Sequence, residues 1–348
     1  MSRNARILAG VFIAGAAALG GFIYMKRGSL GMGGGSPFAG IAVDGPVAGA
    51  ERIFFRHNGV DVHYGKLAYV EPGNPDAINF VDNLTCEVAY VGHQHGICMT
   101  AQRGVVTTYT AQFFDAKTFQ ITSEIVLKGI PSRTRISADD KLGALTVFVT
   151  GHGYTSLDFS TQTLIFDMQT GHVLADLETF EVTQDDKLIK AADFNFWGVT
   201  FAHDSNRFFA TLSTAGKHLL IEGNVTEHKA RVVREHVECP SLSPDGRKIA
   251  YKRRLISEGR IGWQLQVFDL ESQTDTELSE KRSIDDQLEW LDANTVLYSV
   301  PETATDETPS TEVWMAAIDG QAPRRLLQKA YSPAVVRAAS PVQARPGS

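Results

Sequence analysis

The chain has few cysteines and lacks the short motifs that mark several kinds of chemistry. Only three cysteines occur in 348 residues, and no two form a Cys-x-x-Cys pair, which fits neither a disulfide framework nor a zinc ribbon. The Gly-x-Ser-x-Gly pentapeptide of serine hydrolases is missing, as is the Asp-x-Asp-x-Asp-Gly spacing of a calcium loop. The sequence therefore assigns no catalytic residue and no cofactor, and we expect a protein that is not an enzyme.

The chain also has fewer basic than acidic residues. The chain has 33 basic and 40 acidic residues. Three of the basic residues, Arg3, Arg6 and Lys26, stand near the N-terminus, which leaves 30 basic against 40 acidic residues in the rest of the chain. A surface with this excess repels phosphate backbones. Nucleic acid is therefore excluded as a partner.

Long hydrophobic runs are absent apart from residues 7–25, which are 19 uncharged residues in a row. At about 1.5 Å per residue, a helix of this length just spans a hydrocarbon core of about 30 Å. Two arginines and the amino terminus precede the run, while Lys26 and Arg27 follow it, which favours the N-terminus inside the cell. We expect residues 1–27 to anchor the chain in the cell membrane by one pass, with the body extracytoplasmic.

A cleaved signal peptide, and hence a secreted protein, is the alternative. Residues 14–21 include small side chains of the kind found at cleavage sites. Residues 22–25, Phe-Ile-Tyr-Met, extend the apolar run beyond them and favour the anchor.

Composition divides the remaining chain into three parts. Residues 28–37 are rich in Gly and Ser and are expected to form a flexible linker. Residues 337–348 are rich in Pro, Ala and Arg and are expected to be a disordered tail. The folded domain is predicted to cover residues 38–336.

A first landmark recurs through this domain. It is a run of strand-forming residues that ends in an acidic residue and a turn. The acidic positions are Glu71, Asp115, Asp167, Glu222, Asp269 and Asp319. They follow one another at intervals of 44 to 55 residues, a period typical of repeat architectures.

A second landmark, a tight polar turn followed by an apolar strand, precedes most of these runs. It is clear at residues 139–148, 203–212, 243–251 and 292–298, and degenerate at 92–99. Residues 244–246, Pro-Asp-Gly, set such a turn because Pro fixes φ and Gly accepts positive φ. Each period thus offers two hairpins, or about four strands. Four-stranded units at this spacing indicate a β-propeller.

The predicted fold class is therefore all-β, a propeller of six four-stranded blades behind one N-terminal transmembrane or signal helix, with seven blades as the alternative. The predicted blades are residues 48–83, 84–130, 131–182, 194–235, 236–281 and 282–330. Residues 38–47 and 331–336 are expected to share a blade and close the ring, because an open ring exposes strand edges. Residues 182–192 are expected to form a short helical insertion.

Ser241–Tyr251, with the sequence Ser-Leu-Ser-Pro-Asp-Gly-Arg-Lys-Ile-Ala-Tyr, and Leu265–Asp269 resemble the WD40-like Pro-Asp propeller repeat. That repeat occurs in TolB and in the propellers of prolyl-oligopeptidase-type proteases. A propeller behind one hydrophobic segment is similar to actinobacterial TolB-like translocation proteins, and the resemblance covers residues 48–330. The separate α/β domain of TolB and the peptidases' hydrolase domain have no counterpart here. The resemblance implies an extracytoplasmic propeller that holds proteins or peptides, in cell-envelope assembly or transport.

The cysteines allow two interpretations. Cys86 and Cys98 flank an expected hairpin turn at residues 92–96, so they could face each other across two strands as a disulfide. They could equally be two buried, small, apolar residues. Cys239 is expected to be a core thiol.

The sharpest metal candidates are His93 and His95, joined by His152. Imidazoles two apart on a strand face the same side and could share a zinc ion. The first two, however, stand in an expected turn, where polar residues are common, so no metal site is assigned. His57 and His63 are too isolated to count.

Other chemistry-bearing residues have simpler interpretations. The pairs Asp139–Asp140, Asp185–Asp186 and Asp285–Asp286 are expected to be solvated turn residues or strand caps, and residues 252–254 to face solvent. The four tryptophans are expected to pack between blades, with a binding surface as the alternative. They are Trp197, Trp263, Trp290 and Trp314.

The sequence thus favours a binding module, an anchored propeller that presents its loops and channel mouth to a protein or peptide partner. The alternative is a propeller enzyme, lactonase-like or lyase-like, with a metal in the central channel.

Overall fold

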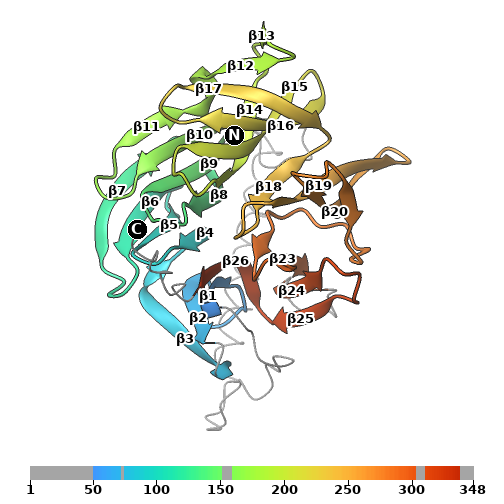
Figure 1. Ribbon diagram of the computed structural model, residues 1–348. Coiled ribbons are helices and arrows are strands. Elements are labelled where there is room, and N and C mark those ends of the chain that lie inside the picture. The colour runs from blue at the N-terminus through green and yellow to red at the C-terminus, as the bar shows by residue number, and fades with distance from the viewer. Residues whose placement is uncertain (1–49, 72–73, 151–158, 303–309, 338–348) are drawn as a thin grey trace, which may run out of the picture. The chain divides into compact units, whose positions relative to one another are not determined.

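A computed structural model describes residues 50–71, 74–150, 159–302 and 310–337. These residues fold into six sheets, antiparallel except for one parallel strand pair, that are arranged one after another around a ring (Figure 1). The predicted all-β, six-bladed propeller with four-stranded blades is confirmed. Residues 7–25, the linker at 28–37 and the tail from residue 338 lie outside the described residues. Within the described ranges, no helix has the length and apolarity to cross a membrane.

The first three blades contain twelve strands in the described residues. Blade 1 contains β26 (Ala330–Arg337), β1 (Ala50–His57), β2 (Lys66–Glu71) and β3 (Asn74–Thr85). Blade 2 contains β4 (Val88–Val91), β5 (His95–Gln102), β6 (Thr108–Asp115) and β7 (Ile121–Leu127). Blade 3 contains β8 (Ile130–Ile136), β9 (Leu142–Thr150), β10 (Ser160–Asp167) and β11 (Val173–Asp176).

The other three blades follow the same plan, and blade 4 carries an extension. Blade 4 contains β14 (Asn195–Phe201), β15 (Arg207–Thr214), β16 (Lys217–Asn224) and β17 (Lys229–Glu235), extended by β12 (Glu181–Gln184) and β13 (Lys187–Ile189). Blade 5 contains β18 (Glu238–Leu242), β19 (Lys248–Ser257), β20 (Arg260–Asp269) and β21 (Asp275–Glu277). Blade 6 contains β22 (Glu289–Trp290), β23 (Thr295–Pro301), β24 (Thr311–Ala317) and β25 (Arg324–Leu327).

We call the strands of each blade A to D, from the innermost outward. The A strands are β26, β4, β8, β14, β18 and β22, and each contacts the next around the ring. They all run in one direction, so the turns that join A to B lie at one end of the ring. We call this end the A–B end, and the opposite end the B–C end.

Both landmarks of the sequence correspond to fixed points of a blade. The polar turns are the A–B turns, and the acidic positions lie at or near the ends of C strands. Asp115 shows why an acid recurs there, since its carboxylate accepts the backbone N–H groups of Lys117 and Thr118 at 3.0 and 2.8 Å. Asp167 and Asp269 cap their C–D turns in the same way. The recurring acid therefore satisfies turn donors that the sheet leaves unpaired.

The core lies between blades. In the described residues each of the six blade interfaces holds a cluster of buried apolar side chains drawn from both neighbours. Trp197 and Trp290 are fully buried and Trp263 nearly so, as the prediction of packing requires. Trp314 is half-buried, and the guanidinium carbon of Arg282 lies 3.9 Å from the centre of the Trp314 ring.

The last described strand closes the ring. Strand β26 supplies the A strand of blade 1 and pairs antiparallel with β1, for example Ala50 with Arg337 and Phe54 with Ala334. The prediction that residues 331–336 complete the first blade is therefore confirmed, whereas residues 38–47 lie outside the described residues. Because of this pairing, β1 begins and β26 ends at the A–B end.

The predicted helical insertion at 182–192 is wrong. Residues 181–189 form a β-hairpin whose first strand, β12, pairs in parallel with β17. The two-residue turn at Asp185 and Asp186 has φ of 50° and 59°, as the type I′ hairpin turn requires. Val182 is fully buried in the cluster between blades 3 and 4, so the segment is held as a strand.

The cysteines occupy two different environments. Cys86 follows β3 and forms a disulfide with Cys98 on β5, with 5.3 Å between their Cα atoms. Both are buried, so the bond joins the blade 1–blade 2 connection to blade 2. Cys239 is a free, fully buried thiol, and burial raises its pKa. It is the core thiol that the sequence predicts.

Candidate functional site

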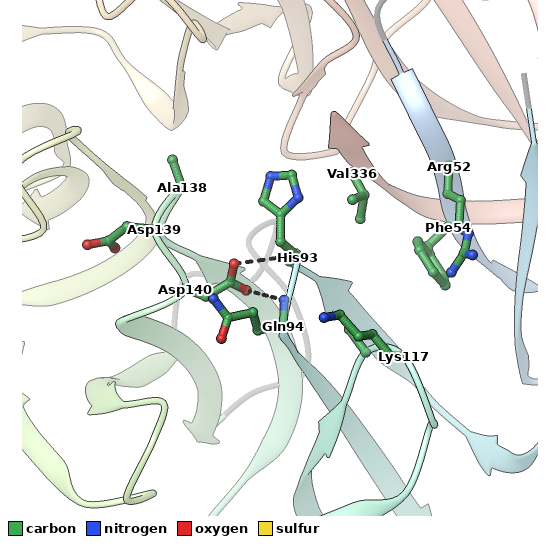
Figure 2. A pocket seen from close by; sticks show the side chains of 11 residues that line it. Arg52, Phe54, His93, Gln94, Lys117, Ala138, Asp139, Asp140 and Val336 are labelled. Atoms are coloured by element: carbon green, nitrogen blue, oxygen red, sulfur yellow. Dashed lines mark hydrogen bonds between the residues drawn. The ribbon is translucent and has the colours of Figure 1, made fainter. Parts of the chain in front are cut away.

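A pocket of about 810 Å³ opens at the A–B end of the ring. Blades 1, 2 and 3 all contribute to it, and blade 1 does so through β1 and β26 (Figure 2). The lining residues are Arg52, Phe54, Gly92, His93, Gln94, Ala116, Lys117, Ala138, Asp139, Asp140 and Val336. We call this hollow the mouth pocket. Because strands of blade 1 and turns of blades 2 and 3 form it, the packing between blades fixes its shape.

Asp140 organises one wall of the mouth pocket. Its carboxylate accepts the backbone N–H groups of His93, Gln94 and His95 at 3.0, 3.2 and 3.3 Å. The side chain is 5% exposed, and the A–B turn of blade 2 wraps around it (Figure 2). A Cβ at Gly92 would overlap this carboxylate, so the glycine lets the turn approach. Asp140 therefore fastens the turns of blades 2 and 3 to each other.

Asp139, its neighbour, is neutralised within its own turn. Lys141 lies 2.9 Å from the carboxylate, and the Ser137 hydroxyl donates to it at 2.8 Å. Although burial raises the pKa of Asp139, hydrogen bonds from its neighbours outweigh this and bring it down to about 2. This carboxylate is therefore ionised and already compensated.

The opposite walls are cationic. Arg52 on β1 is half-buried, with its guanidinium 5.1 Å above the ring of Tyr69. Lys117, in the C–D turn of blade 2, is exposed, as is His93 on the wall that Asp140 organises. Among the described residues, neither Arg52 nor Lys117 has a carboxylate within ion-pair distance.

An aromatic group supports the Arg52 side of the pocket. The ring of Phe54 lies 5.2 Å from that of Tyr69 and 6.2 Å from that of Phe119. These three rings belong to blades 1 and 2 and join the two blades beneath the pocket. Tilted and edge-on arrangements of this kind are favourable, so the wall is rigid.

Further inside the ring, a buried ionic group crosses the A strands. The carboxylate of Glu289 on β22 pairs with Arg135 on β8, and it accepts the hydroxyl of Tyr90 on β4 at 3.2 Å. Arg337 of β26 lies 3.3 Å away. Burial opposes the charge of Arg135, but Glu289 raises its pKa, so it stays cationic. Four blades are thus tied together through one carboxylate.

A second buried ionic group contradicts the expectation that residues 252–254 face solvent. Lys252 is fully buried, pairs with Asp285, and lies 4.7 Å above the ring of Trp263. Arg254 is half-buried and donates from Nε to Glu238 at 2.7 Å. The prediction is wrong for Lys252 and Arg254. Each is paired with a carboxylate from a neighbouring segment, and a charged side chain can be buried when it is paired in this way.

The predicted aspartate pairs differ in their exposure to solvent. Asp185 and Asp186 are exposed turn residues, as predicted. Asp140 and Asp286 are not solvated, since they are 5% and 4% exposed and bind backbone N–H groups. The local sequence does not reveal this difference, because the partners come from other blades or strands.

The histidine candidates do not assemble into a metal site in the described part of the chain. No group of three His, Cys, Asp or Glu side chains there could hold a metal ion. His93 stands in the A–B turn and His95 begins β5, while His152 lies outside the described residues. His57 and His63, expected to be isolated, instead share Asp61, and the His57 Nε2–Asp61 Oδ2 distance is 2.9 Å.

Two residues of the mouth pocket, Arg52 and Lys117, were missed from the sequence. Lys117 stands in the turn that follows the Asp115 landmark, and Arg52 directly precedes the apolar residues 53–55 within β1. Nothing in their local sequence shows that blades 1 and 2 bring them to one hollow. A repeat alignment that placed every C–D turn at the same end of the ring is the signal that could have pointed to Lys117.

No protein-family model matches the sequence, and no curated protein does either. Solved structures do resemble the fold. TolB from Acinetobacter baumannii is 16% identical, with a TM-score of 0.56 over 84% of this chain and 68% of that chain. A protein described as TolB from Agrobacterium tumefaciens is 11% identical (TM-score 0.45, 80% and 89% covered). Oligogalacturonate lyase in complex with manganese is also 11% identical (TM-score 0.46, 74% and 77% covered).

Fold and pocket together define a closed six-bladed β-propeller whose A–B end carries a polar hollow. The likeness to TolB, at low identity, concerns the fold alone. The fold of the chain is therefore that of a TolB-like β-propeller.

Proposed function

We propose that this protein is an extracytoplasmic, membrane-anchored propeller that holds a protein or peptide partner in the mouth pocket without catalysing a reaction, in cell-envelope assembly or transport. The observation that carries the proposal is the pocket itself, about 810 Å³ and formed by strands of blade 1 and turns of blades 2 and 3. Pockets of about 300–1,000 Å³ are typical of specific binding sites. Turns on a rigid scaffold are also where recognition is usually found.

The disulfide supports a location outside the cytoplasm. Cys86 and Cys98 are joined inside the protein, and disulfides persist in oxidising environments and are rare in the cytosol. The uncharged run at residues 7–25 has the length of a membrane span. Both observations favour a propeller outside the cytoplasm on a single-pass anchor.

The charges inside the ring support a scaffold over a channel-metal enzyme. The carboxylates Glu289 and Asp285 already pair with Arg135, Arg133 and Lys252. A divalent cation would have to displace these built-in cations, at the cost of leaving them buried and unpaired. The cavity lined by Arg133 and Arg135 measures only about 20 Å³, which is too small for a substrate.

Site-directed photocrosslinking tests the proposal. The full-length protein is expressed in its host with a benzophenone amino acid at position 117, in the mouth pocket, or at position 105, an exposed B–C turn residue at the opposite end. We expect irradiation to give a discrete protein or peptide adduct from position 117 and not from position 105. Ala138→Trp, which fills the pocket, should abolish it. Equal adducts at both positions, or none at position 117, would contradict binding at the pocket.

A metal titration addresses the alternative. Because the channel carboxylates are paired, Mn²⁺, Ca²⁺ or Zn²⁺ at millimolar concentration should leave the unfolding temperature of the detergent-solubilised protein unchanged. A large stabilisation by one of these ions, abolished by Glu289→Gln, would favour the channel-metal enzyme.

A further inference from the structure

The charges of the mouth pocket are one-sided once internal pairing is considered. The Asp140 carboxylate accepts three backbone N–H groups, and Asp139 is paired with Lys141 and accepts the Ser137 hydroxyl. Among the described residues, Arg52 and Lys117 remain without a carboxylate within ion-pair distance, and Figure 2 shows both on the side of the pocket away from Asp139. The pocket therefore offers unpaired positive charge although the whole protein has a net charge of −7.

Arg52 is held in an orientation suited to a carboxylate. Its guanidinium carbon lies 5.1 Å from the ring centre of Tyr69, a cation–π contact that holds the group against the wall. The N–H donors of a guanidinium lie in its plane, where they match the two oxygens of a carboxylate. The cation–π contact therefore restricts the side chain while leaving its donors available, which lowers the entropy lost on binding.

Four of the remaining lining residues are apolar, namely Phe54, Ala116, Ala138 and Val336. Phe54 and Val336 belong to blade 1, Ala116 to blade 2 and Ala138 to blade 3, so apolar and cationic side chains line the same pocket. A ligand that fits both must carry a carboxylate beside an apolar side chain.

We infer that the mouth pocket recognises a carboxylate of its partner, borne by a peptide segment with a neighbouring apolar side chain. Arg52 and Lys117 bind the carboxylate, and Phe54 and Val336 contact the apolar group. This inference rests on the proposed function and specifies the chemistry of its partner. The carboxylate can belong to an acidic side chain or to the C-terminus of a peptide, and the test separates the two.

The test uses two random-peptide libraries, one with the variable segment internal and one with it ending in a free carboxyl group. Both are selected against the full-length, detergent-solubilised protein. We expect Asp and Glu to be enriched over the starting library in the first, or free-carboxyl ligands to dominate the second. Amidation, or Glu→Gln in a selected peptide, should then weaken binding about tenfold or more, as loss of a charge-assisted contact does.

Substitutions at Arg52 and Lys117 test whether the selected peptides bind in the mouth pocket. Arg52→Gln and Lys117→Gln should each weaken the selected peptide about tenfold, and added salt should weaken it further. Lys128→Gln is the matched control, since Lys128 is exposed at the B–C end, and it should change nothing. Lys117 is an exposed turn residue, so its variant keeps the test valid if Arg52→Gln fails to unfold cooperatively.

The outcomes separate the inference from the proposed function. Peptides that bind without any carboxylate, yet are lost with Ala138→Trp, would overturn the carboxylate inference and leave the binding function standing. Peptides unaffected by every pocket variant, or no binding peptide from either library, would overturn both.

Discussion

The carboxylates of the A–B turns differ in what they bind, and this difference is decided residue by residue. Asp140 holds three backbone donors from the neighbouring blade, whereas Asp185 has the same positive φ but stands exposed on a hairpin turn. A hydrogen bond to a charged group contributes about 1.5–3 kcal/mol. Two aspartates that both have positive φ and both stand in turns therefore contribute unequally to stability.

Replacing Asp140 should destabilise the fold. In Asp140→Asn the backbone conformation is kept, because Asn tolerates positive φ, but the amide nitrogen cannot accept the N–H groups of His93 to His95. We expect a loss of about 2 kcal/mol in the free energy of unfolding, measured by urea titration. Asp185→Asn is the control and should stay within about 0.5 kcal/mol of the wild type. Equal values for both variants would contradict the role assigned to Asp140.

Glu178 makes a pH-dependent contribution. It lies in the short 3₁₀ helix η1 (Leu177–Thr179), accepts the N–H of Thr163 at 2.9 Å, and stands beside Asp176. Burial and then the contact with Asp176 raise its pKa to about 9. The folded protein therefore holds a proton that the unfolded chain releases near pH 4.3, roughly the ordinary value for Glu.

Since the folded state binds more protons, stability should fall as pH rises from about 4.5 to about 9. Glu178→Gln has no proton to lose, so its stability should decline less over this range. Urea titrations of both proteins at pH 5, 7 and 9 measure the difference, which cannot exceed about 1.4 kcal/mol per pH unit for one proton. Parallel curves for the two proteins would show that Glu178 titrates normally.

At the scale of elements, the sequence predicts most of the hairpins because they repeat. Pro244 and Gly246 mark one A–B turn, and the acids at 115, 167 and 269 mark C-strand ends by capping the turns that follow. Residues 182–192 were misread as a helix because their hairpin turn is Asp-Asp rather than Asn-Gly. Strand β12 is stabilised by pairing with β17, a partner that lies too far along the sequence for any local pattern to reveal.

The disulfide is the covalent contribution to blade 2. Its two cysteines are separated by 12 positions, and closing a loop of about 15 residues stabilises a protein by about 3 kcal/mol. We expect a reductant to lower the unfolding free energy of the wild type by about this amount and to leave Cys86→Ala/Cys98→Ala unchanged. Urea titration with and without dithiothreitol checks it. A wild type insensitive to the reductant would show that the two thiols are not joined.

At the scale of the whole molecule, the ring creates the site. Arg52, Lys117 and Asp140 belong to three blades and meet only when the A strands close. The Glu289–Arg135 pair spans 154 positions. Sequence periodicity predicts how many blades there are, but it does not predict which side chains of different blades meet. The fold was therefore largely predictable and the pocket was not.

Removing β26 should open the ring. A protein that ends at Lys329 lacks the A strand of blade 1, so β1 is left with an exposed edge and Glu289 loses Arg337. We expect aggregation or non-cooperative unfolding, measured by light scattering and circular dichroism. A protein that ends at Arg337 keeps every described strand and should unfold like the full-length form. Cooperative unfolding of the shorter protein would show that closure is dispensable.

The position of β26 in the sequence also determines the order in which the blades can be completed during translation. A ribosome completes the strands of blades 2 to 6 before it reaches residue 330, so the nascent polypeptide holds blade 1 as three strands throughout translation. The inner edge of β1 stays unpaired until β26, the last described strand, has been synthesised. Neither the pocket nor the Glu289 cluster can form before then, because Val336 and Arg337 belong to that strand. Binding competence is therefore a property only of the finished polypeptide.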